Sequence, residues 1–125
     1  LVNIMTTVKS SVKHFRIDAV AQVSGKAGCL DVPYYVETSK KVVEERNKFY
    51  NFLKDNGFYV LESETNFLFA KHPKIGGDEL YKRIKEQSIL IRHFSTKGIE
   101  DFVRITIGTK EEMDALREAM LKAIK

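Results

Sequence analysis

One short run, Phe102–Ile107, places the strongest constraint on how this chain folds. It is rich in aromatic and β-branched residues and is followed by a glycine, which predicts a short, well-bounded β-strand. Side chains alternate between the two faces of a strand, so every second residue shares a face. One face is aliphatic and is expected to pack in a core: Val103, Ile105 and Ile107. The opposite face carries a permanent positive charge, Arg104, between an aromatic residue and a threonine.

Arg104 is a candidate for anion recognition, because a guanidinium can form two parallel hydrogen bonds with a carboxylate or a phosphate. A second arginine, Arg92, directly follows the apolar run Ile89–Ile91, which predicts a neighbouring strand. Arginines at the ends of adjacent strands can converge on one anion, so both are candidate substrate-binding residues. The alternative for Arg104 is a solvated side chain or a surface ion pair with Glu100 or Asp101.

The N-terminal half of the chain predicts helices. Residues 1–9 have the apolar spacing of a helix end, and a second helix follows to about residue 30. That second helix is rich in small residues, and its inward-facing side chains are expected to be Ile17, Val20, Ala21 and Leu30. A longer helix is predicted from Pro33 to Asn56, with Gly57 in the left-handed turn that ends it. Its apolar stripe is expected to contain Val42, Phe49 and Leu53, with Arg46 in line with them.

The C-terminal half predicts a small sheet with two further helices. Residues 58–61 and 65–70 read as a hairpin, residues 78–87 as a helix, and residues 89–91 and 102–107 as two more strands. Thr109 and Glu112 have the spacing of a capping box, which predicts the start of the last helix. The predicted fold class is therefore α+β, with a small, mainly antiparallel sheet packed with helices.

The composition argues against several classes of protein. The chain has 125 residues, of which 43% are hydrophobic and 30% charged, and it lacks the long apolar run of a membrane span. Its net charge of +4 is modest, and its lysines are interleaved with acids, which argues against nucleic-acid binding. A single cysteine makes no internal disulfide, so a cytoplasmic location is expected. The first residue is leucine, so the chain is expected to begin within a longer protein.

The other reactive residues give no site. Three histidines are isolated in the sequence, and each is expected to have a packing or surface role: His14, His72 and His93. Cys29 lies in the small-residue helix and is expected to be a packed thiol. Lys26, within Ser24–Gly28, lacks the spacing of a phosphate-binding loop and the strand that should precede it. No catalytic, cofactor-binding or metal-binding residue is therefore assigned in this chain.

Several motifs nevertheless resemble a known family, in order and spacing. They are Thr65-Asn66-Phe67-Leu68-Phe69, Leu80-Tyr81, Ile89-Leu90-Ile91-Arg92, Val103-Arg104-Ile105-Thr106-Ile107-Gly108-Thr109 and Glu111-Glu112. They resemble the C-terminal part of the histidinol-phosphate aminotransferases, which are fold-type I pyridoxal-phosphate enzymes of class I/II. Upstream, Ala19–Gln22 and Glu44–Arg46 are similar to the linker and the long helix of that family.

The resemblance implies a division of the chain and of its roles. Residues 1–32 would be linker helices from a large domain, and residues 33–125 the small domain that closes over the cofactor. Arg104 and Arg92 would bind the anionic group of the substrate, histidinol phosphate or glutamate. Pyridoxal phosphate would be bound by the large domain, and the intact enzyme would be a homodimer. The lysine that forms the Schiff base has no counterpart here, so the chain alone is predicted to be inactive.

Other assignments remain open. Within the same class, the chain could belong to another class I/II aminotransferase or to a threonine-phosphate decarboxylase. In a different class, it could be a stand-alone α+β module that binds a small anion or RNA. Against RNA, the aromatic residues are not grouped in the sequence as a stacking platform flanked by basic residues.

Overall fold

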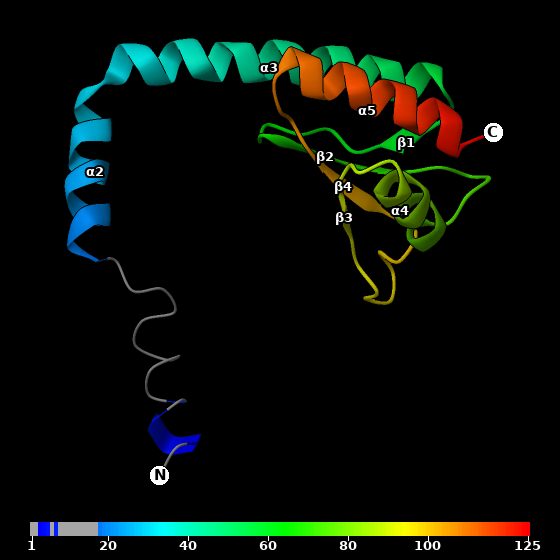
Figure 1. Cartoon of the computed structure of the whole chain (residues 1–125), viewed down its shortest axis with the longest axis horizontal. Helices are drawn as coiled ribbons and strands as arrows, with labels where there is room; N and C mark the ends of the chain where they lie inside the picture. Colours follow the sequence, from blue (N-terminus) through cyan, green and yellow to red (C-terminus); the bar gives the residue numbers. More distant parts are fainter. Residues whose placement is uncertain (1–2, 6, 8–17) are drawn as a thin grey trace. The chain divides into compact units, whose positions relative to one another are not determined.

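The structure is a computed structural model that describes residues 3–5, 7 and 18–125 of the chain. By their contacts, the residues divide into two compact units, 1–36 and 37–125, and the long helix α3 (Val32–Asp55) includes residues of both. Figure 1 shows the elements of each unit. Each unit is described by itself below.

The first unit contains helix α2, Ala19–Leu30, and the start of α3. The side chain of Asp18 caps α2 by accepting a hydrogen bond of 2.7 Å from the amide of Ala21. No residue of α2 is buried, so the expectation of inward-facing apolar residues is wrong for Val20 and Leu30, which are 74% and 76% exposed. Cys29 is exposed rather than packed. The physical reason is that the described residues of this unit form no second apolar layer against the helix.

Some predictions for the N-terminal residues concern residues outside the described part of the chain. Residues 3–5 and 7 are helical, in agreement with a helix end at residues 1–9. Ile17 and His14 lie outside the described residues. Within the described part, α2 confirms a helix that ends at Leu30.

The second unit is built on a four-stranded antiparallel sheet in the order β1-β2-β4-β3. Its strands are β1 (Tyr59–Val60), β2 (Phe67–Lys71), β3 (Arg92–His93) and β4 (Val103–Thr106). Helix α4 (Gly77–Glu86) joins β2 to β3, and α5 (Lys110–Ala123) follows β4 (Figure 1). The predicted α+β class and its antiparallel sheet are confirmed.

Helices α3, α4 and α5 contribute to one core on one face of the sheet. The alternate strand residues Leu68, Val103 and Ile105 are at most 1% exposed. They pack with apolar side chains of the helices: Phe49 and Leu53 of α3, Leu80 and Ile84 of α4, and Met113, Leu116 and Met120 of α5. The opposite face of the sheet carries the other strand residues, including Arg104, and no helix of this unit supplies a core there.

Local signals explain where several elements begin and end. Gly57 has a φ of +82°, the left-handed conformation expected after α3. Thr109 and Glu112 form the predicted capping box, in which each side chain bonds the other's backbone amide. Gly77 is the first residue of α4, and a Cβ atom there would lie 2.7 Å from the carbonyl oxygen of Glu100. Only glycine therefore allows the start of α4 to approach the segment before β4 this closely.

The predicted strand at Ile89–Ile91 is wrong. The strand is Arg92–His93, and Ile89 and Ile91 only pack partly against the core, while Leu90 is 74% exposed. Ser88 has a positive φ of 62°, so the chain is still leaving α4 when the apolar run begins. Pairing with β4 starts only at Arg92. Ile89 and Ile91 are partly buried, but they do not belong to a hydrogen-bonded strand pair.

Candidate functional site

The open face of the sheet brings both predicted arginines into one row. In the antiparallel register, Arg104 of β4 lies opposite Arg92 of β3 on one side and opposite Phe69 of β2 on the other. Residues that are directly opposite in a sheet point to the same face. The row Phe69–Arg104–Arg92 therefore crosses three neighbouring strands and faces away from the helices.

Arg104 is half-buried among aromatic rings. Its guanidinium carbon lies 5.2 Å from the centroid of the Phe67 ring and 5.9 Å from that of Phe94. Its Nε atom is buried and has no hydrogen-bond partner within the described part of the chain. Burial of an unpaired donor costs about 1–3 kcal/mol. No ion pair joins Arg104 to Glu100 or Asp101 in residues 18–125, so the surface-pair alternative does not apply there.

A pocket of about 470 Å³ lies beside this guanidinium. Its lining is mainly apolar and comes from β2, from the segment after β3, and from the loop that joins β1 to β2. The lining residues are Leu61, Glu62, Ser63, Glu64, Thr65, Phe67, Phe69, Phe94, Ile99 and Arg104. Arg104 is the one basic residue among them, so a bound anion would find its charge-assisted hydrogen bonds at that side chain.

Arg92 lies on the strand next to Arg104, as predicted, and its role in binding a substrate stays a prediction. It is exposed and does not line the pocket, and its guanidinium carbon lies 5.5 Å from the centroid of Phe94. Both guanidinium groups therefore contact the same ring, Phe94, in the cation–π distance range. Phe94 was not predicted as a neighbour of either arginine. It lies two residues after Arg92, which places both side chains on the same face of an extended chain, and this spacing could have indicated the contact.

Aromatic residues gather on this face in greater number than the sequence indicated. Phe69 stacks on Phe102 with ring centroids 4.6 Å apart, and Phe102 in turn meets Tyr59 at 6.2 Å. The amino group of Lys71 lies 5.0 Å from the centroid of Phe102. Segments that are distant in the sequence thus bring aromatic and basic residues together on this face.

The described histidines have structural roles. His93 bonds the carbonyl oxygen of Glu100 through Nε2 at 2.8 Å and stacks against Tyr81 of α4. His72 packs its ring on Phe58, with centroids 4.7 Å apart, and its Nδ1 accepts from the amide of Lys74 at 3.3 Å. Neither residue lines the Arg104 pocket.

His72 should make stability depend on pH. Burial lowers the pKa of His72 below 6.5, so the unfolded chain binds more protons as the pH falls through that value. We expect wild type to lose a small part of its melting temperature between about pH 7.5 and about pH 5.5. His72→Gln should lose less over the same range, as measured by thermal unfolding. Equal losses in both proteins would contradict a destabilising protonation of His72.

In residues 3–5, 7 and 18–125, no group of three or more His, Cys, Asp or Glu side chains could hold a metal ion. None of the helices in that part of the chain is long and apolar enough to cross a membrane.

Pyridoxal phosphate needs a lysine amine for its Schiff base. The residues that line the Arg104 pocket include no lysine, so this lining does not fit the aldehyde of that cofactor. The lining carries one guanidinium, Arg104, and two carboxylates, Glu62 and Glu64.

The sequence of the chain is similar to those of known aminotransferases. The chain is 42% identical over 120 residues to the histidinol-phosphate aminotransferase of Clostridium beijerinckii, an alignment that covers 96% of this chain and 34% of that protein. It is 37% identical over 118 residues to the histidinol-phosphate aminotransferase of Lactococcus lactis subsp. lactis, with coverages of 94% and 33%. The chain thus spans about a third of the length of the curated relatives it matches.

A solved structure supports the same relationship. The histidinol-phosphate aminotransferase of Sinorhizobium meliloti, in complex with pyridoxal-5'-phosphate, superposes with a TM-score of 0.70 at 26% identity. That superposition covers 76% of this chain and 27% of the other. The family described as aminotransferase class I and II matches residues 3–120. The chain therefore belongs to the class I and II aminotransferase family.

Proposed function

We propose that this chain is the small domain of a pyridoxal-phosphate-dependent histidinol-phosphate aminotransferase of histidine biosynthesis. In this proposal residues 1–32 are linker helices and residues 33–125 form the small domain. The full-length enzyme is a cytoplasmic homodimer that holds the cofactor in its large domain. The names of the relatives support the substrate, and the match to about a third of their length supports the assignment to one domain.

The observation that carries the proposal is the unpaired, buried Nε of Arg104 in a mainly apolar pocket. In this reading Arg104 binds the anionic group of the amino-group donor or acceptor. The rings of Phe67 and Phe94 hold the guanidinium in place and keep water from it. Charge-assisted hydrogen bonds are strongest where water is excluded, so the aromatic walls strengthen the contact.

The role of this chain in the reaction is to bind and orient the substrate. Pyridoxal phosphate, when bound, supplies the electron sink for transfer of the amino group. A substrate held by its anion at Arg104 has its amino end directed to one place, which lowers the entropic part of the barrier. The chain alone, residues 1–125, should therefore not transaminate.

The direct test is an assay of the full-length enzyme that carries this sequence, with histidinol phosphate and 2-oxoglutarate as the substrates. Turnover with that pair, and trapping of the cofactor by borohydride on a lysine outside residues 1–125, would support the proposal. Turnover only with other amino acids would point to another class I/II aminotransferase. Release of carbon dioxide from threonine phosphate would point to the decarboxylase.

A second candidate function has one observation in its favour. The aromatic and basic residues on the open face resemble a surface for single-stranded RNA. However, Phe69 and Phe102 stack on each other at an interplanar angle of 10°, which occupies ring faces that bases would need. Binding of single-stranded RNA that weakens steeply with salt would favour this alternative.

Arg92 is expected to matter less than Arg104. Its side chain is exposed, so loss of its contact with an anion should cost about 1 kcal/mol. Arg92→Ala in the full-length enzyme should lower kcat/KM by about fivefold. Steady-state kinetics with histidinol phosphate measure this. A loss as large as that of an Arg104 variant would show that the two arginines share the anion equally.

A further inference from the structure

Arg46 is a charged residue in the interior of the second unit. It lies on α3, in line with Phe49 and Leu53, and is only 6% exposed. Arginine is rarely buried unless its donors are paired. Its position outside the Arg104 pocket means that direct contact with a substrate there does not explain the burial.

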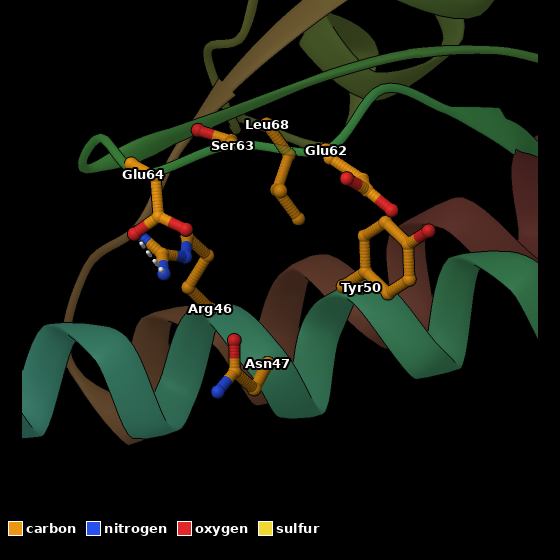
Figure 2. A pocket seen from close by; sticks show the side chains of 7 residues that line it. All are labelled: Arg46, Asn47, Tyr50, Glu62, Ser63, Glu64 and Leu68. Carbon is orange, nitrogen blue, oxygen red and sulfur yellow. Dashed lines mark ion pairs between the residues drawn. The ribbon is translucent and has the colours of Figure 1, made fainter.

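The main partner of Arg46 is a backbone carbonyl of the β1–β2 loop. Its Nη1 donates a hydrogen bond of 2.8 Å to the oxygen of Thr65. Its Nη2 lies 3.8 Å from a carboxylate oxygen of Glu64, the ion pair drawn in Figure 2. The Glu64 side chain is fully exposed, so that ion pair contributes little. The buried charge is therefore held chiefly by the loop backbone.

The same loop forms a wall between two cavities. A cavity of about 220 Å³ lies between α3 and the loop. Figure 2 shows its lining side chains, with Arg46, Asn47 and Tyr50 on the helix. Loop residues 62–64 line this cavity and also line the pocket of Arg104. Arg46 thus contacts from behind the loop that forms one wall of that pocket.

Hydrogen bonds connect the loop to the backbone of Phe67, whose ring lies beside Arg104. The hydroxyl of Ser63 donates to the carbonyl oxygen of Phe67 at 2.7 Å. The amide of Phe67 donates to the hydroxyl of Thr65 at 3.3 Å. The ring of Phe67 is the one that lies 5.2 Å from the guanidinium of Arg104. A displacement of Thr65 would therefore reach the wall of the anion pocket through Phe67.

We infer that Arg46 is a positioning residue: by holding the carbonyl of Thr65, it sets the loop and the Phe67 ring against Arg104 and so tunes affinity for the anionic group of the substrate. This inference rests on the proposed function. It assigns Arg46 a role in substrate recognition without contact with the substrate.

The test compares Arg46→Met, Arg46→Lys and Arg117→Met in the full-length enzyme. Arg117 is a matched control, because this partly buried arginine also contacts α3, through Glu45 at 2.6 Å, but does not line the Arg104 pocket. Arg46→Met should raise KM for the anionic substrate by about 10-fold or more, with a smaller change in kcat. Arg46→Lys should recover part of the loss, and Arg117→Met should keep KM within about twofold of wild type.

Two further readouts separate positioning from general destabilisation. Arg46→Met should leave KM unchanged for histidinol, which lacks the phosphate. Amide hydrogen exchange should quicken by about fivefold or more in the peptide of residues 61–67, and not in residues 110–123 of α5. These results together would support the inference.

Other results would overturn it. Unchanged KM and unchanged exchange in Arg46→Met would show that the Thr65 contact does not set the pocket. Equal quickening in residues 61–67 and 110–123 would show a merely structural role. If wild type does not transaminate, the proposed function fails, and the exchange measurements still decide whether Arg46 holds the loop.

Discussion

Replacing Arg104 by alanine is expected to lower kcat/KM of the full-length enzyme for histidinol phosphate by about 10²- to 10³-fold. The physical reason is the loss of the basic residue that lines the pocket, in a place where aromatic rings limit the access of water. Loss of one partner of a buried charge pair costs about 2–5 kcal/mol, or about 30- to 5,000-fold, and the expected effect lies in the middle of this range. Steady-state kinetics on both substrates would measure the effect.

Two variants sharpen this prediction. Arg104→Lys keeps the charge but loses the planar pair of donors, so it should recover only part of the activity. Thr106→Ala, on the same face of β4 but exposed and outside the pocket lining, should remain close to wild type. If Arg104→Ala retained wild-type kinetics, its assignment as the anion-binding residue would be wrong.

Replacing Phe49 by alanine should destabilise the second unit by about 3–5 kcal/mol. Phe49 is fully buried on α3, where its ring lies 5.4 Å from that of Phe52 and 5.4 Å from the guanidinium carbon of Arg117. The substitution removes a large ring at the junction of α3 and α5 and leaves a cavity that the neighbours fill only partly. Urea unfolding followed by circular dichroism would measure the change in free energy of unfolding.

The control for this prediction is Val43→Ala on the same helix. Val43 is 40% exposed, so its truncation should cost less than about 1 kcal/mol. The contrast between the two variants separates loss of core packing from a change in helix propensity. A cost for Phe49→Ala no larger than that for Val43→Ala would contradict the central place of Phe49 in the core.

Local patterns were sufficient to predict most elements of the second unit. The alternation around Arg104 placed Val103, Ile105 and Ile107 on the core face, and all three are buried. Gly57 and the capping box of Thr109 marked helix boundaries through backbone geometry that any surrounding fold must satisfy. These signals depend on a few neighbouring residues, so they can be read without knowledge of the tertiary structure.

The errors arose where burial and pairing depend on residues distant in the sequence. An apolar run at 89–91 has the composition of a strand, but a strand also needs a partner, and β4 pairs only from Arg92 onward. Burial of α2 was expected from its apolar residues, but none of the residues of this helix is buried. In both cases the missing information was which other segment lies alongside.

The candidate site was predictable only in part for the same reason. Arg104 could be identified from its place in a strand, because a charge within an aliphatic run is unusual. Its neighbours Phe67 and Phe94 come from separate segments, and the unpaired Nε depends on how those rings surround it. No local pattern encodes this enclosure.

Within the second unit, the helices pack on one face of the sheet, so neighbouring residues of one strand serve separate purposes. In β2, Leu68 and Ala70 pack in the core, while Phe67 and Phe69 line the pocket. A substitution at a pocket-facing position of β2 is therefore expected to alter the pocket while the core packing of the strand is kept. The lining of the pocket and the stability of the unit are thus expected to respond to different, alternating positions of the same strand.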